Sequence, residues 1–367
     1  MEWSITTNKD WSTLEQTFPW VADMQHVPQD PLHHAEGDVA IHTRMVLEAL
    51  QATARYQSLA PQQQQILWAA ALLHDVEKRS TTQQEGDRII SPGHARRGER
   101  TAREILYTQV PTPFVIREQV AALVRYHGLP LWILEKPDPL KSLLEASLRV
   151  QMPLLALLAE ADARGRICAD QQDLLERIEL FIAFCEEQHC WQTPRRFVNG
   201  LAQFTYFQKE NGSPEYIPYD DLKGEVMMLS GLPGMGKDTF LQKHYPGLPV
   251  VSLDNIRRQH KLKPEDTAAT GWAVQQAKEQ AREYLRQGRP FAWNATNITR
   301  SVRTQWIDLF VTYKARVRLV YIEVPYKDWL HQNKNREHAV PQKALMHLLQ
   351  KLEVPAPHEA HEVTYVV

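Results

Sequence analysis

Residues 225–239 read EVMMLSGLPGMGKDT, and this stretch decides the fold of the second half of the chain. An apolar run typical of a strand, 225–230, leads into a glycine-rich loop, and a helix is predicted to begin after Lys237. Backbone amides and a helix N-terminus attract anions, so this order predicts a phosphate-binding loop. Lys237 can neutralise the β and γ phosphates of a nucleotide, and Thr239 opens the helix. Three glycines permit close approach of the backbone, namely Gly231, Gly234 and Gly236.

Asp238 departs from the usual form of this loop, in which a Ser or Thr that binds the metal directly follows the lysine. We still predict that the loop binds ATP or another nucleoside triphosphate with Mg²⁺. The predicted nucleotide contacts are Gly231, Gly234, Gly236, Lys237, Asp238 and Thr239.

Further strand-like runs alternate with helical segments after residue 224, which predicts an α/β domain with a parallel sheet. Ligands of such sheets lie beyond the carboxyl ends of the strands. Asp254 follows the second run, where a carboxylate can accept a proton from a hydroxyl, and Arg257 lies one turn later, where it can hold a phosphate. Asp254 is equally suited to cap a helix N-terminus. The predicted strands are 225–230, 249–253, 290–295 and 317–324.

Residues 1–190 show helical patterns and few strand patterns, so an all-α domain is expected there. This half holds histidines and acids in the order His, His–Asp, His, His, Asp. Imidazole and carboxylate together suit Mn²⁺, Fe²⁺, Co²⁺, Ni²⁺ or Zn²⁺, and the two oxygens of one Asp can bridge two ions. Two such ions would activate a water to attack phosphorus. The predicted metal ligands are His42, His74, Asp75, His94, His127 and Asp162.

The length of 367 residues fits two domains, and we expect a first domain at 1–190, a linker at 191–222 and a second domain at 223–367. Residues 223–367 carry a net charge of +7 and residues 1–222 a net charge of −9. The second half is therefore the better candidate for holding a polyanion. Three cysteines and the absence of an apolar leader or a membrane-length run indicate a cytoplasmic protein without membrane contact.

The second half resembles the polynucleotide 5′-hydroxyl kinases in its loop, in the run SLDNIR at 252–257, in the pair Thr296–Asn297 and in a lid arginine before Val340–Pro341. The resemblance covers residues 223 to about 355. It departs from the family at Ala295, where an Asp is frequent.

This resemblance assigns roles to individual residues. It implies that Lys237 and Thr239 hold the donor and that Asp254 is the general base. Arg257 would contact the acceptor phosphate, and Arg336 would clamp donor phosphates from the lid. Arg300 and Arg303 either hold the acceptor as well or are solvated helix arginines.

The first half resembles the HD phosphohydrolase superfamily, an all-helical fold, over residues 30 to about 185. His94 and His127 place it with the members that hold two metal ions, and Asp75 would be the catalytic bridging ligand. Lys78 matches a position that touches substrate phosphate, or is a solvated lysine. His33 and His34 either line the phosphate pocket or belong to a loop.

Together the two halves resemble the bacterial HD-Pnk proteins. That resemblance implies healing of RNA ends, with phosphorylation of 5′-hydroxyl ends of RNA or DNA and hydrolysis of 2′,3′-cyclic or 2′-phosphate ends, before a separate RNA ligase acts. Two alternatives stay open: a kinase of small molecules such as nucleosides joined to a nucleotidase, and a nucleotide-sensing module that gates the hydrolase.

Overall fold

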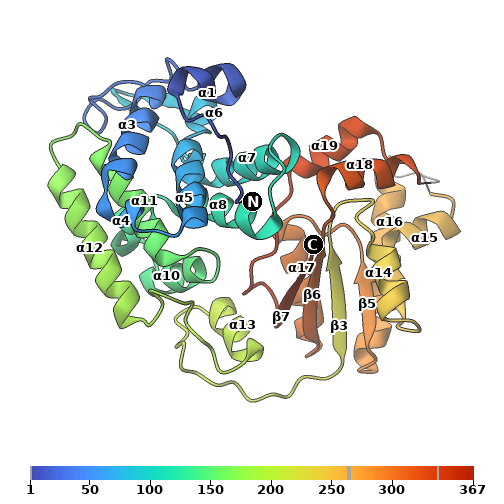
Figure 1. The fold of residues 1–367 in the computed structure, drawn as a ribbon. Helices are drawn as coiled ribbons and strands as arrows, with labels where there is room; N and C mark the ends of the chain where they lie inside the picture. Colours follow the sequence, from blue (N-terminus) through green and yellow to red (C-terminus); the bar gives the residue numbers. More distant parts are fainter. Residues whose placement is uncertain (1, 263–265, 337–338) are drawn as a thin grey trace. The chain divides into compact units, whose positions relative to one another are not determined.

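The computed structural model describes residues 2–262, 266–336 and 339–367. The chain divides into two compact units, Met1–Arg195 and Arg196–Val367, whose elements are labelled in Figure 1. Each unit has its own core.

The first unit is helical apart from one short antiparallel hairpin, β1 (Gln83–Glu85) with β2 (Arg88–Ile90). A 3₁₀ turn, η1, spans Ile133–Glu135. The helices are α1 (Trp11–Thr17), α2 (Pro19–Ala22), α3 (Val39–Ala52), α4 (Ala54–Gln57), α5 (Pro61–Leu73), α6 (Lys78–Thr81), α7 (His94–Thr108), α8 (Phe114–Tyr126), α9 (Leu129–Trp132), α10 (Pro139–Ser147), α11 (Met152–Arg164) and α12 (Gln171–Glu187).

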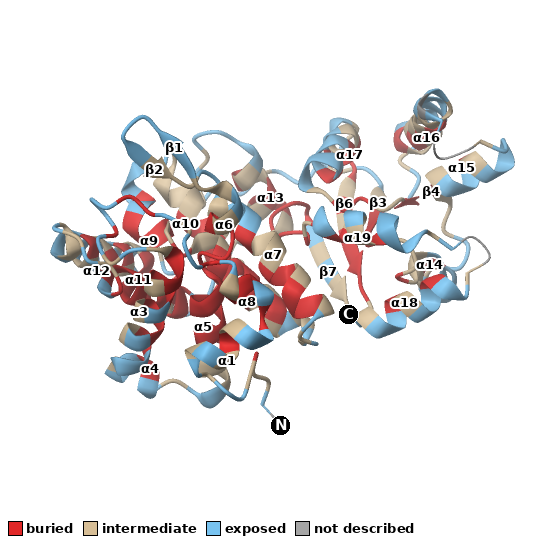
Figure 2. Cartoon of the chain, turned by 90° about the horizontal axis from the view of Figure 1, so that it is seen from above, coloured by how far each residue is buried: buried red, intermediate tan, exposed pale blue. Residues whose placement is uncertain are grey.

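Helix α5 forms the centre of this unit. Pro61 occupies its first turn, where a missing N–H is harmless, and every residue from Ile66 to Leu73 is buried. A helix that is apolar on all sides must be surrounded by other elements. Helix α5 contacts α3, α8 and α11, and Figure 2 shows it as mostly buried. The predicted helical fold of the first half is therefore confirmed.

The second unit is built on a five-stranded sheet in the order β4-β5-β3-β6-β7, and all neighbouring strands are parallel. This confirms the predicted parallel α/β fold. The elements are α13 (Gly200–Gln208), β3 (Glu225–Ser230), α14 (Lys237–His244), β4 (Val250–Ser252), α15 (Leu253–Gln259), α16 (Thr267–Arg286), β5 (Phe291–Asn294), α17 (Arg300–Thr312), β6 (Arg316–Ile322), α18 (Tyr326–Lys334), α19 (Gln342–Gln350) and β7 (Glu362–Val366).

The register of the sheet aligns the carboxyl ends of β3, β4 and β5. Leu229 of β3 pairs with Asn294 of β5, and Ser252 of β4 pairs with the same Asn294. The carboxyl ends of these three strands therefore share one edge, from which α14 and α15 begin.

Helices cover both faces of the sheet. In Figure 2, α16 and α17 lie on one side and α14 and α18 on the other. The face under α16 and α17 buries Trp293 against Trp306 and Phe310, with ring centroids 4.3 and 5.7 Å away. Aromatic packing of this kind anchors β5 in the core of the second unit.

Two elements of the second unit differ from the sequence-based expectation. Helix α13 lies in the stretch expected to be a linker, and its Phe204 joins the core of the second unit. Strand β7 was not predicted, because it is an edge strand of five residues and none of them is fully buried.

Among the described residues no single helix is long and apolar enough to cross a membrane. The pair α10 and α11 passes by length and composition together, with a bend of 111° between them.

Candidate functional site

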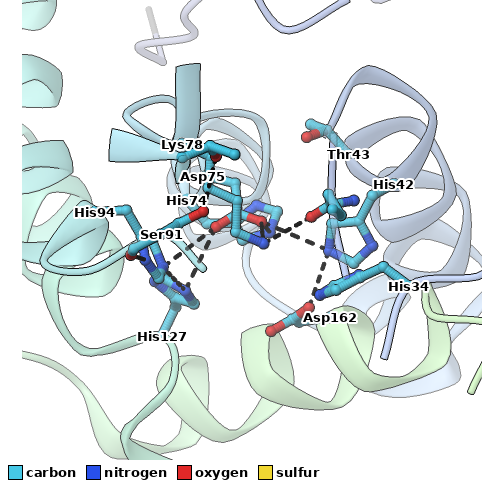
Figure 3. A network of polar contacts seen from close by, with 12 residues as sticks. His34, His42, Thr43, His74, Asp75, Lys78, Ser91, His94, His127 and Asp162 are labelled. Atoms are coloured by element: carbon cyan, nitrogen blue, oxygen red, sulfur yellow. Dashed lines mark hydrogen bonds and ion pairs between the residues drawn. The ribbon is translucent and has the colours of Figure 1, made fainter. Parts of the chain in front are cut away.

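The six predicted metal ligands lie together in the first unit, although up to 120 residues separate them in the chain. They come from separate elements around α5. His42 lies on α3, His94 starts α7, His127 follows α8, Asp162 lies on α11, and His74 with Asp75 forms the turn after α5. Figure 3 shows all six side chains converging.

The histidines are oriented by acceptors at Nδ1. In three of them this nitrogen lies close to a carbonyl oxygen three residues earlier: His74 at 2.7 Å from Ala71, and His94 and His127 at 2.8 Å from Ser91 and Val124. His42 Nδ1 lies 2.8 Å from Glu36 Oε1. An acceptor at Nδ1 fixes the tautomer with the proton there, so Nε2 keeps its lone pair for a metal.

The ligand atoms form two groups of three, one of His42, His74 and Asp162, and one of Asp75, His94 and His127. Asp75 lies between the groups. Its Oδ1 is 3.4 Å from His94 Nε2, while its Oδ2 is 3.2 Å from His74 Nε2. Asp75 therefore presents one oxygen to each group, as a carboxylate that bridges two ions must.

Charges at this centre favour cations. Burial alone would raise the pKa of Asp75 and of Asp162. Lys78 beside Asp75 and Arg166 beside Asp162, each together with the neighbouring histidines, hold both pKa values well below the usual range. Burial lowers the pKa of His127 to about 3 and also lowers that of His94. Asp75 thus faces two imidazoles, those of His94 and His127, whose lowered pKa favours the neutral form.

The pKa of His74 shifts in the opposite direction from the pKa values of His94 and His127. Burial acts to lower its pKa, but the carboxylates of Asp75 and Asp162 and the Ala71 carbonyl together raise that pKa. The surroundings of His74 are therefore electronegative, which favours a cation there.

The residues present fit a pair of divalent transition ions. His74 Nε2 and Asp75 Oδ1 are buried and have no hydrogen-bond partner in the described ranges. Such atoms are costly unless something binds them, and nitrogen and oxygen donors in these groups suit transition ions.

Glu36 and Arg166 were not predicted, and both support the ligands. Glu36 contacts His34 Nδ1 at 2.7 Å as well as His42, and it accepts from the Ile167 amide at 2.8 Å. Arg166 donates to Asp162 Oδ2 at 2.7 Å, one helical turn after it. Only the i, i+4 spacing of Asp162 and Arg166 was a usable signal in the sequence.

Two cavities, of about 530 and about 400 Å³, adjoin the metal-ligand cluster. His34 and Lys78, two of the predicted phosphate contacts, line both, and His33 lines the smaller one. Lys78 is buried, with Nζ 2.8 Å from Asp75 and 2.7 Å from Gln29, so it is not a solvated lysine. A phosphate contact by these three residues stays a proposal.

The glycine-rich loop of the second unit joins β3 to α14. Gly231 has φ 150°, and a side chain there would lie 2.4 Å from the Ile322 carbonyl oxygen, so only glycine fits. The Gly231 amide donates to the Thr296 carbonyl at 2.9 Å, and the Asn297 side chain donates to the Leu229 carbonyl at 2.6 Å. The predicted Thr–Asn pair thus braces the start of the loop.

A cavity of about 210 Å³ lies over this loop. Lys237 Nζ donates to the loop carbonyls of Gly231 and Leu232, at 2.7 and 2.9 Å. Burial lowers the pKa of Lys237 to about 8. The residues lining the cavity are Pro233, Gly234, Gly236, Lys237, Asp238, Thr239, Asp254, Asn294, Ala295, Thr296, Gln332 and Arg336.

Asp238 contacts the neighbouring strand. Asn294, the last residue of β5, donates from Nδ2 to Asp238 Oδ1 at 2.5 Å. Carboxylate and amide oxygens are ligands that Mg²⁺ accepts, so the donor chemistry of this pair fits the ion.

The predicted base and clamp residues lie around this cavity. Asp254 lines it from the start of α15 and has its carboxylate 3.1 Å from the guanidinium of Arg257. Ser252, not Asp254, caps α15, since its hydroxyl accepts from the Asn255 amide. Arg336 lines the cavity too, and its buried Nη1 has no hydrogen-bond partner in the part of the chain that is described.

Arg303 has a different place from the one expected. It is fully buried, pairs with both oxygens of Glu359 and donates to the Asn297 and Glu353 carbonyls. Its donors are therefore used inside the domain, and it is neither solvated nor open to an acceptor phosphate. Arg300 contacts His358 Nε2 at 3.1 Å and does not line the cavity.

Two family models match the chain. One, described as HD domain, matches residues 39–170, and the other, described as AAA domain, matches residues 226–355. The first range holds all six candidate ligands, and the second holds the loop, Asp254 and Arg336. The chain therefore has a helical unit that matches the HD domain model, followed by a parallel α/β unit with a phosphate-binding loop that matches the AAA domain model. An HD domain implies a divalent metal, and a P-loop domain of this kind implies a nucleotide with Mg²⁺.

Curated relatives are similar over part of the chain. The multifunctional CCA protein of Methylococcus capsulatus is 32% identical over 172 residues, which are 44% of this chain and 36% of the relative. That of Nitrosospira multiformis is 34% identical over 120 residues, which are 33% of this chain and 26% of the relative. The chain thus spans about a third or less of these two proteins.

Among solved structures, a sugar kinase from Janibacter sp. is 19% identical, with a TM-score of 0.30 over 39% of this chain and 85% of that one.

Proposed function

We propose that this chain heals the ends of cleaved RNA, as the bacterial HD-Pnk proteins that it resembles do. The second unit would transfer phosphate from a nucleoside triphosphate to a 5′-hydroxyl end. The first unit would hydrolyse 2′,3′-cyclic or 2′-phosphate ends.

The observation that carries the proposal is that one chain holds two sites of opposite chemistry. Carboxylates and imidazoles cluster at the first, while a phosphate loop, a carboxylate and an arginine line the cavity of the second. Many ribonucleases leave a 2′,3′-cyclic phosphate and a 5′-hydroxyl, and neither end can be ligated. One site of each kind would convert both ends.

In the first unit, Asp75 would hold two ions through its two oxygens, with His42, His74 and Asp162 around one and His94 and His127 around the other. The ions, when bound, supply Lewis acidity and an activated water. Lys78 and His34 line the cavities beside Asp75 and would orient the phosphate. Glu36 and Arg166 would hold His42 and Asp162 in position.

In the second unit, Asp254 would accept the proton of the 5′-hydroxyl. The hydroxyl oxygen would then bond to the γ phosphorus of the triphosphate while the nucleoside diphosphate leaves. The Lys237 ammonium would give up its hydrogen bonds to the loop carbonyls and donate to phosphate oxygens instead. Arg336 would bind the donor phosphates through its unpartnered Nη1. Asp238 and Asn294 would hold Mg²⁺. Arg257, beside Asp254, would meet the acceptor phosphate.

The test is incubation with γ-labelled triphosphate and a 5′-hydroxyl oligoribonucleotide that carries a 2′,3′-cyclic end, with Mg²⁺ and Mn²⁺ present. Label at the 5′ end and loss of the cyclic phosphate are expected in the same reaction. A free nucleoside offered as a competing acceptor distinguishes the small-molecule alternative, because preference for the nucleoside contradicts the proposal. Binding of triphosphate without transfer to any hydroxyl would favour the sensor.

A further inference from the structure

Trp132 is exposed next to the metal-ligand cluster and has no part in the mechanism above. It ends α9 and is 36% exposed, whereas its neighbours Leu131 and Ile133 are each 2% exposed. It lines both of the cavities that adjoin the cluster. A large aromatic surface left open at the wall of a cavity is available to a flat ligand.

The indole ring is held in place from one side. The guanidinium of Arg177 lies over it, 4.7 Å from the ring centroid. Arg177 itself donates to Glu135 at 2.7 Å and to the Leu131 carbonyl at 3.1 Å. A cation fixed over one face orients the ring and leaves the part that borders the cavities open.

The larger cavity joins this ring to the metal-ligand cluster. Its lining includes Asp75, His94 and His127 of the cluster together with Trp132 and Lys136. Its volume of about 530 Å³ lies within the roughly 300–1,000 Å³ of small-molecule sites. A ligand with a phosphate at the metal ligands and a flat ring at Trp132 therefore fits the space.

The charges of the cavity select an anion. Lys78, Arg125, Lys136 and Arg166 line it, against Glu145 and Asp75 among the acids. The Lys136 side chain makes no ion pair among the residues described. A phosphorylated ligand that also carries an aromatic ring meets both the cations and the indole.

We propose that Trp132 is the stacking platform for the nucleobase of the terminal nucleotide, whose ribose phosphate reacts at the metal centre. This rests on the proposed phosphohydrolase function and adds to it the recognition of a base. Every nucleobase has a π face that can stack on an indole ring. The site would therefore bind a terminal nucleotide without distinguishing which base it carries.

The test compares two substrates, adenosine 2′,3′-cyclic phosphate and the same cyclic phosphate on 1,4-anhydroribitol, which has no base. Trp132→Ala should lower kcat/KM for the adenosine substrate roughly 10- to 100-fold, mainly through KM, because stacking is lost. It should leave the baseless substrate unchanged, and Trp132→Phe should recover most of the loss.

Leu134→Ala is the matched control, since Leu134 is 63% exposed two residues away and lines neither cavity. It should change neither substrate, and the metal content of all variants should equal that of the unmodified chain. Equal losses on both substrates, or none on the adenosine substrate, would overturn the platform while leaving the hydrolase in place.

If the unmodified chain hydrolyses neither substrate, the proposed phosphohydrolase function is wrong, but the stacking role of Trp132 is still open to a test by binding. Equilibrium binding of adenosine 2′-monophosphate then decides: the platform predicts binding that is roughly 10- to 100-fold weaker in Trp132→Ala alone, and equal binding by all variants refutes it.

Discussion

Asp238 and Asn294 together reverse the usual distribution of ligands at a phosphate loop. A hydroxyl residue normally follows the loop lysine, and an Asp on a neighbouring strand normally helps to hold Mg²⁺. Here the acid follows Lys237 and an amide ends β5, and the two side chains touch at 2.5 Å. The pair carries one negative charge, as the usual pair does, with the carboxylate on the other partner.

An exchange of the two residues tests this reading. Asp238→Ser removes the only carboxylate of the pair, and Asn294→Asp places two carboxylates against each other. Each single variant should therefore bind Mn²⁺ with ATP about 10- to 100-fold more weakly. The double variant should recover most of the affinity, because the usual arrangement is restored. Calorimetric titration and manganese resonance measure this without turnover, and a double variant as weak as the two losses combined would contradict it.

Lys237 makes nucleotide binding depend on pH. Burial, with a smaller effect of Arg336, lowers its pKa to about 8, although Asp238 and Asp254 oppose the shift. Below pH 8 the ammonium is already charged. Above pH 8 a proton must be taken up when phosphate binds, so affinity should fall by up to about tenfold per pH unit.

The measurement is the dissociation constant of ATP between pH 7 and 10 without divalent metal. Lys237→Arg is the matched control, because its guanidinium stays charged throughout this range. A dissociation constant of the unmodified chain that is as flat as that of the arginine variant would show that the ammonium is not desolvated.

Among the elements, α13 shows how closely a short helix fits the second unit. Asn199 caps it by accepting from the Ala202 amide at 2.8 Å, and Gln203 donates to the Pro357 carbonyl at 2.9 Å. A side chain at Gly200 would lie 1.9 Å from the His361 carbonyl oxygen, just before β7. The helix and the edge of the sheet are therefore in direct contact.

Gly200→Ala should destabilise the second unit by roughly 3 kcal/mol, because an added methyl must displace backbone. Gly271→Ala in α16 is the matched control, since the added methyl there meets nothing within 4 Å, and it should be neutral or stabilising by about 0.5–1 kcal/mol. Urea unfolding followed by tryptophan fluorescence compares the two. Similar midpoints for both variants would contradict the close packing.

On the scale of the whole molecule, the two units hold separate chemical machinery. Each has its own core, and the candidate metal ligands belong to the first unit while the cavity over the glycine-rich loop belongs to the second. A variant in one site should therefore leave the other activity intact.

Asp254→Asn should abolish phosphate transfer, by about 100-fold or more, since the proposed base is lost, and should leave hydrolysis of the cyclic end unchanged. His74→Ala with Asp75→Ala should do the reverse and lose bound transition metal. Each variant is the control for the other. Loss of both activities in either variant would mean that the sites depend on each other, provided that circular dichroism shows a folded chain.

The sequence by itself determined the order of the two folds, and it predicted most of the residues that we propose carry their chemistry. The glycine loop, the strand runs and the alternation of helices need only local pattern, because each element follows from the period of its own apolar residues. The six ligands were recognisable from their types and order and from the resemblance, before their side chains were seen to converge.

Only the tertiary structure decided how these residues are held and which of them are accessible. Glu36, which contacts His42, lies in a loop that has no apolar periodicity to predict its place. Arg303 pairs with Glu359, which is 56 residues away in the chain. Trp132 reads like any apolar residue of a short helix until the cavities beside it are known. The reason is physical: contacts between distant segments depend on how whole elements pack, and local pattern does not contain that information.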